Sequence, residues 1–122
     1  MNIHKSAEDY LEMILMLREQ KGYTRSIDIA GALGVTKPSV SFAMKRLRES
    51  GYIMMDEDNY ITLTDKGMDI ARKIYARHKA LTRFLIQLGV DEKTAREDAC
   101  EIEHDISEET FQAVLRQLPQ EE

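Results

Sequence analysis

The feature that most limits the fold is the order of short elements over residues 26–63. The segment SIDIAGAL has the apolar spacing of a short helix, and Gly34 directly after it predicts a tight turn. A second helix is expected from the N-cap Thr36 to about Ser50, with Pro38 near its start, where a missing N–H costs little. The period then changes, since YIMM, DEDN and YITL predict two short strands joined by a polar turn. This order is typical of a winged helix-turn-helix.

The segments on either side of this unit are predicted to be helical, because apolar residues recur there at helical spacing. The fold class is therefore expected to be mainly α, with an N-terminal winged helix-turn-helix followed by a helical region. No apolar run approaches the roughly 18 residues that cross a bilayer, and a single cysteine excludes an internal disulfide, so we expect a cytoplasmic protein. The further helices are expected over residues 6–20, 64–88, 91–105 and 107–118.

The net charge of −5 averages two regions of opposite sign. Residues 24–48 hold five basic side chains and one acidic side chain, a net charge of +4. Residues 91–109 hold two basic and nine acidic side chains, a net charge of −7. A basic segment that contains the second helix of a helix-turn-helix is typical of a DNA-binding surface, although two solvated faces would give the same counts.

The second helix of such a motif lies in the major groove of double-stranded DNA. Val40, Met44 and Leu47 are spaced to face the core, so the opposite face is expected to meet the DNA. Hydroxyls there can bond base edges, Phe42 can pack on a thymine methyl, and basic side chains suit phosphates. The alternative is a winged helix that binds protein. The predicted DNA-contacting residues are Arg25, Thr36, Lys37, Pro38, Ser39, Ser41, Phe42, Lys45 and Arg46.

A second group of residues has the chemistry of a metal site. Cys100, Glu103 and His104 stand at i, i+3 and i+4, which would place them on one helix face. A thiol, a carboxylate and an imidazole together suit a divalent transition metal. Each also has an ordinary explanation, because carboxylates favour helix N-termini and a buried cysteine packs as a small hydrophobe. If three helices pack together, the candidate ligands for one or two ions are Asp9, Glu12, His78, Cys100, Glu103 and His104.

Three stretches resemble one known family. AEDYLE at 7–12, Arg77-His78 and EIEH at 101–104 are similar to the iron- and manganese-dependent repressors of the diphtheria toxin repressor family, especially the manganese transport regulators. The resemblance covers essentially the whole chain. It implies a dimeric repressor, not an enzyme, that binds palindromic operator DNA of metal uptake genes when metal is bound.

The same resemblance assigns the parts of the chain. It implies a DNA-binding domain over residues 1–63 and a helical dimerisation and metal-binding domain over residues 64–122. Because the chain ends at Glu122, we expect it to belong to the short branch, without the SH3-like domain of the iron-dependent branch.

The resemblance also bears on which metal binds. Cys100 falls where the manganese branch has Glu and the iron branch has Cys, whereas Asp9 falls where the iron branch has Met. A carboxylate favours Mn(II) and a thiolate favours Fe(II) or later metals. We expect Mn(II), with Fe(II) as the alternative, and Cys100 could supply its thiolate, its backbone carbonyl or packing alone. The positions that match the ligands of the manganese regulators are Asp9, Glu12, His78, Glu103 and His104.

Three other functions would use parts of the same pattern. A metal-independent winged-helix regulator would sense a small organic molecule in the helical region. A small metallohydrolase would hold an ion on His78, Glu103 and His104 with Glu101 as base, but no Gly-rich phosphate loop accompanies them. A redox sensor would act through the thiol of Cys100. We expect the repressor rather than any of these.

Overall fold

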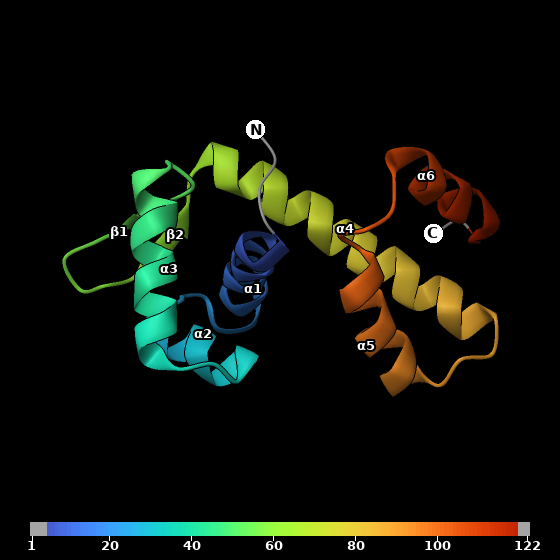
Figure 1. The fold of residues 1–122 in the computed structure, drawn as a ribbon, viewed down its shortest axis with the longest axis horizontal. Coiled ribbons are helices and arrows are strands. Elements are labelled where there is room, and N and C mark those ends of the chain that lie inside the picture. Colours follow the sequence, from blue (N-terminus) through green and yellow to red (C-terminus); the bar gives the residue numbers. More distant parts are fainter. Residues whose placement is uncertain (1–4, 120–122) are drawn as a thin grey trace. The chain divides into compact units, whose positions relative to one another are not determined.

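A computed structural model describes residues 5–119, which form six helices and a two-stranded sheet (Figure 1). The mainly α class is therefore confirmed. The chain divides into two compact units, which we call the winged unit (to Arg72) and the helical unit (from Lys73). Within the described range, no helix is long and apolar enough to cross a membrane. The elements are α1 (Lys5–Lys21), α2 (Ser26–Leu33), α3 (Lys37–Glu49), β1 (Ile53–Met55), β2 (Ile61–Leu63), α4 (Asp65–Gln87), α5 (Glu92–Ile102) and α6 (Glu108–Gln117).

The helix-turn-helix of the winged unit forms as its sequence predicts. Gly34 takes a left-handed φ of 67°, and its N–H donates to Ala30 O, which ends α2 in a tight turn. Thr36 then caps α3, since its hydroxyl accepts the N–H of Ser39, and Pro38 stands in the first turn. These local features set the direction in which α3 leaves the turn.

The hairpin after α3 pairs β1 with β2 in antiparallel register, with Ile53 opposite Leu63. Its turn is held by Asp56, whose Oδ1 accepts the N–H groups of Asp58 and Tyr60, each at 2.9 Å. The expected strands are present, although each is only three residues long. The acidic turn at residues 56–58 is therefore structural in part, because the Asp56 carboxylate orders its backbone.

The core of the winged unit lies between its three helices and the hairpin. Helix α1 packs on α2 and β2, and α3 packs on α2 and β1. Thr24, fully buried between α1 and α2, donates its hydroxyl to Ile14 O, and its own carbonyl accepts the N–H of Ile61. The buried apolar side chains include Leu11, Ile14, Ile29, Val40, Met44, Leu47, Ile53 and Ile61.

The start of α4 explains a glycine in a helix. Thr64 caps α4, because its hydroxyl accepts the N–H of Gly67 while donating to Gly51 O. A Cβ on Gly67 would lie 2.0 Å from the backbone oxygen of Tyr52. The hairpin therefore passes so close to the first turn of α4 that only glycine fits there.

The helical unit contains the rest of α4 with α5 and α6. Helix α5 ends at Ile102, so the expected helix to residue 105 is wrong at its C-terminal end. The carbonyls of Glu103 and Ile106 accept hydrogen bonds from Arg77 instead of continuing a helical ladder. Ser107 then caps α6 by accepting the N–H of Thr110, as its sequence predicts.

Candidate metal centre and DNA-binding surface

Three of the predicted ligands meet inside the helical unit. Glu103 follows α5 as its C-cap, and His78 comes from the middle of α4. His78 Nδ1 lies 3.0 Å from Glu103 Oε2, and His104 Nε2 lies 3.4 Å from Glu103 Oε1. One carboxylate is thus flanked by two imidazoles that come from separate segments.

The donor set of this cluster fits a divalent cation. Glu103 has no exposed surface, and its Oε1 accepts no hydrogen bond from the described residues. A buried carboxylate oxygen without a donor is costly, and a cation placed there would remove that cost. Two imidazole nitrogens and a carboxylate are ligands that Mn(II), Fe(II) and Zn(II) all accept. The residues present therefore fit a metal centre.

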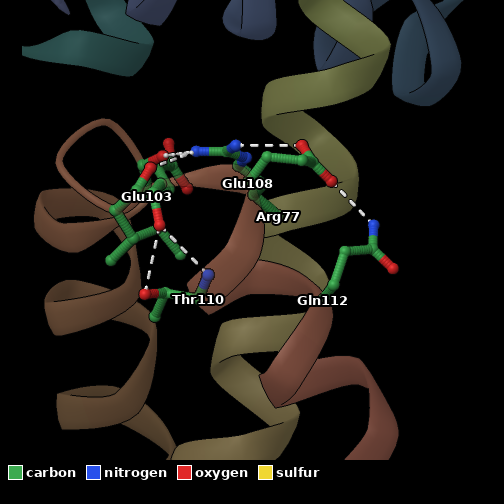
Figure 2. Close-up of polar contacts among 7 residues, drawn as sticks. Arg77, Glu103, Glu108, Thr110 and Gln112 are labelled. Atoms are coloured by element: carbon green, nitrogen blue, oxygen red, sulfur yellow. Dashed lines mark hydrogen bonds and ion pairs between the residues drawn. The ribbon is translucent and has the colours of Figure 1, made fainter.

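A side chain next to this cluster holds the loop that carries it. Figure 2 shows the guanidinium of Arg77 between the Glu103 loop and Glu108. Its Nη1 donates to Glu103 O at 3.2 Å and to Ile106 O at 2.9 Å, and its Nη2 donates to the Glu108 carboxylate at 3.2 Å. The Gln112 amide, with Arg77 second, holds the pKa of Glu108 below its usual range.

Arg77 is part of the Arg77-His78 motif, but the sequence analysis predicts no role for its side chain. A signal was available in the spacing along α4. Ile74, Arg77 and Leu81 stand at i, i+3 and i+7, and all three are buried. A basic residue on an apolar helix stripe predicts a buried charge with dedicated partners.

The remaining predicted ligands belong to other segments. Asp9 and Glu12 lie on α1 of the winged unit, one helical turn apart. Cys100 lies on α5, half-buried, one turn before Glu103. Glu103 is the C-cap of α5 and keeps helical backbone angles, and one of its carboxylate oxygens lies within 4.8 Å of Cys100 Sγ, so these two residues share a face. His104 stands in the turn that follows.

All nine predicted DNA-contacting residues are exposed in the winged unit. Val40, Met44 and Leu47 are buried on the opposite side of α3, as expected. Phe42 leaves 63% of its surface exposed, with the Arg46 guanidinium 5.7 Å from its ring centre. The exposed set is Arg25, Thr36, Lys37, Pro38, Ser39, Ser41, Phe42, Lys45 and Arg46.

Arg25 has structural partners as well as exposure. Its guanidinium lies 4.4 Å from the ring centre of Tyr60 and donates to Asp58 O at 3.0 Å. Its backbone N–H donates to Asp28, which also pairs with Lys21. This side chain therefore joins the start of α2 to the turn of the hairpin.

The comparisons with known proteins also separate a DNA-binding part of the chain from a metal-binding part. Residues 2–60 match the N-terminal DNA binding domain of the iron dependent repressors, and residues 64–120 match their metal binding and dimerisation domain. The chain belongs to the iron-dependent repressor family. Members of this family are metal-dependent transcriptional repressors, so the chain is a DNA-binding regulator and not an enzyme.

Similar proteins come from archaea and bacteria. An HTH-type transcriptional regulator of Methanocaldococcus jannaschii is 39% identical over 110 residues, covering 88% of each chain. The regulator MntR of Bacillus subtilis is 41% identical over 102 residues, covering 84% of this chain and 72% of its own.

Solved structures share the fold. The manganese regulator SloR superposes with a TM-score of 0.79 at 28% identity, covering 95% of this chain and 54% of its own. A manganese-dependent repressor in complex with manganese gives a TM-score of 0.82 at 27% identity, covering 91% of this chain and 51% of its own. This chain spans about half the length of these solved chains.

Proposed function

We propose that the chain is a manganese-responsive repressor that acts in the cytoplasm and binds palindromic operators of metal uptake genes as a homodimer. Residues 1–63 bind the DNA, and residues 64–122 bind metal and dimerise. The observation that carries the proposal is the buried Glu103 carboxylate between two imidazoles. Manganese regulators among the similar proteins support the choice of metal.

The metal is held by six residues in this proposal. Asp9 and Glu12 are included because their i, i+3 spacing on α1 makes a chelating carboxylate pair. A bound divalent cation supplies positive charge that offsets carboxylates which otherwise repel one another. Whether the site takes one ion or two is decided by metal stoichiometry. The proposed ligands are Asp9, Glu12, His78, Cys100, Glu103 and His104.

Coupling to DNA follows from where these ligands lie in the sequence. Asp9 and Glu12 belong to the helix that supports the helix-turn-helix, whereas the histidines and Glu103 belong to the helical unit. Ligands drawn from both restrict the motion of the two DNA-binding units of a dimer. A palindrome with half-sites about 34 Å apart is read only when both α3 helices are correctly spaced. Tighter metal binding by that state gives the coupling.

The proposal is tested by measuring operator affinity against each buffered metal. The expected result is weak binding in EDTA and strong binding in Mn(II), with less activation by other ions at their cellular levels. Elemental analysis alone is a poor substitute, since later metals outcompete manganese at most sites. Equal affinity in EDTA and in Mn(II) would contradict the metal switch and favour a metal-independent regulator.

A matched pair of variants tests the site. Glu103→Gln removes a buried carboxylate, whereas Glu97→Gln removes an exposed one from the same helical unit. We expect the first to lose Mn(II)-activated DNA binding and the second to retain it. A Glu103→Gln protein with a normal Mn(II) response would show that the ligands have been assigned wrongly.

Iron is the second candidate because of one residue. Cys100 lies half-buried one turn before Glu103, and its thiolate would favour Fe(II) over Mn(II). Replacement by glutamate supplies a carboxylate at that position. If the thiolate is a ligand, Cys100→Glu raises the affinity for Mn(II) relative to Fe(II). If the ratio of the Mn(II) and Fe(II) affinities is unchanged, Cys100 contributes only its backbone carbonyl or its packing.

A further inference from the structure

We propose that Arg77 is the positioning residue of the metal centre. It holds the segment carrying Glu103 and His104 against the helix that carries His78. This inference rests on the proposed metal-binding function and adds a residue that touches no metal itself. Four observations carry it: the contacts of Arg77, its burial, the charge balance around it and its place in the sequence.

The contacts of Arg77 lie on both sides of one turn. Its Nη1 donates to Glu103 O, at the end of α5, and to Ile106 O, just before α6. Its Nη2 donates to the carboxylate of Glu108 in the first turn of α6 (Figure 2). One side chain thus fixes both ends of the segment 103–106, which contains two proposed ligands.

Burial makes this arrangement rigid. Arg77 leaves 7% of its surface exposed, and its guanidinium lies 5.3 Å from the ring centre of Phe111 on α6. A planar guanidinium offers donors in fixed directions, so it can bond two carbonyls and a carboxylate together. A lysine ammonium at the same position has a different shape and cannot reproduce this fork.

The charge balance keeps the Glu103 carboxylate available. Arg77 binds the backbone oxygen of Glu103 and pairs its charge with Glu108. The Glu103 carboxylate instead faces His78 and His104. A guanidinium bound to that carboxylate would compete with a cation, whereas this one positions it and has its own counter-ion.

The position of Arg77 in the sequence links it to the third ligand. It directly precedes His78 on α4, so the same helical turn carries the fork and an imidazole. The hydroxyl of Thr82 donates to His78 O one turn later. Loss of the fork would therefore change the distance between His78 and the Glu103 segment rather than remove a ligand.

The test measures Mn(II) affinity by the EPR signal of free Mn(II). Arg77→Met keeps an apolar stem and removes every donor, and Arg77→Lys keeps the charge. Arg96→Met is the matched control, because Arg96 is exposed and pairs with the exposed Glu92 one turn earlier on α5. We expect about a tenfold to hundredfold loss of affinity in Arg77→Met, a partial recovery in Arg77→Lys and no change in Arg96→Met.

A spectroscopic measurement separates positioning from general stability. Co(II) bound in place of Mn(II) has ligand-field bands that depend on ligand geometry. We expect these bands to change in Arg77→Met and to stay as in the wild type in Arg96→Met. Urea unfolding of each apo protein gives the loss of stability for comparison. Weaker metal binding with unchanged Co(II) bands would mean a purely structural role and would overturn the proposal.

The remaining outcomes are also decisive. If the wild type binds no Mn(II) or Co(II), the proposed function itself fails. If the wild type binds and Arg77→Met binds equally well, only the present inference fails. Should Arg77→Met not fold, Arg77→Lys decides in its place: full affinity and unchanged Co(II) bands would contradict the requirement for a guanidinium fork.

Discussion

In the DNA binding that we propose, different residues on α3 contact bases and phosphates. Phe42 exposes its aromatic ring, and packing in the core does not explain an aromatic residue at that position. Lys45 and Arg46 carry charge on the same exposed surface. An apolar contact to a base discriminates between sequences, whereas a cation near a phosphate raises affinity for all of them. The two kinds of contact can therefore be separated by mutation.

Phe42→Ala is expected to lower operator affinity by about 1–3 kcal/mol, the usual cost of one lost base contact. Affinity for unrelated DNA should change little, because phosphate contacts remain. Since Phe42 is exposed, the free energy of unfolding should stay within about 0.5 kcal/mol of wild type. Fluorescence anisotropy with operator and scrambled duplexes checks this. Equal losses on both duplexes would argue against base readout.

Lys45→Gln is expected to weaken binding to operator and scrambled DNA by similar factors. Each lost phosphate contact reduces the slope of log affinity against log salt concentration by about 1. The measurement is a salt titration of both duplexes with wild type and variant. If the slope of log affinity against log salt concentration is the same in the variant as in wild type, Lys45 makes no phosphate contact.

At the scale of elements, close approaches decide which substitutions the fold tolerates. Gly67 and Gly31 both lie inside helices, where alanine is normally the better residue by about 0.5–1 kcal/mol. A Cβ on Gly67 would meet Tyr52 O, whereas a Cβ on Gly31 would meet nothing within 4 Å. Substitution by alanine should therefore change the free energy of unfolding in opposite directions at the two positions.

Gly67→Ala is expected to destabilise the protein by about 1–3 kcal/mol, because α4 and the hairpin must separate. Gly31→Ala is expected to stabilise it by about 0.5–1 kcal/mol. Urea unfolding followed by circular dichroism gives both values. Similar changes of one sign in both variants would contradict the close approach.

The link between α4 and α6 should depend on pH. The pKa of Glu108 lies below its usual range, first because the Gln112 amide donates to its carboxylate and then because Arg77 does. A lowered folded-state pKa contributes stability above the unfolded value, and this contribution is lost as the pH falls through the folded value. Wild type should therefore be more stable than Glu108→Gln at pH 7, and the difference should shrink below about pH 4. A pH-independent difference would contradict the charge pairing.

The sequence predicts these elements unevenly. The helix-turn-helix and the hairpin are predicted from Gly34, Thr36 and the change in spacing of the apolar residues, because such signals act within a few residues. The end of α5 did not follow, since Arg77, more than 20 residues earlier, supplies the donors that replace helical continuation. His78 and Glu103 were named as candidates from residue type and family resemblance. Their 3.0 Å separation, however, depends on tertiary packing that no local pattern encodes.

For the molecule as a whole, bound metal should raise stability. A ligand that binds only the folded state stabilises it by about 2.7 kcal/mol at a hundred times its Kd. Mn(II) should therefore raise Tm in wild type, with EDTA reversing the rise. The same addition should leave Tm of Glu103→Gln nearly unchanged. A Tm that ignores Mn(II) in wild type would contradict the proposed centre.

The short hairpin has a consequence for solubility. An unpaired strand edge can recruit a second chain and start aggregation. The edge of β2 is partly occupied, because Ile61 N–H donates to Thr24 O. β1 is only three residues long and packs against α3. Strands this short offer too few backbone groups to template another sheet, so concentrated protein should resist fibril formation through the wing.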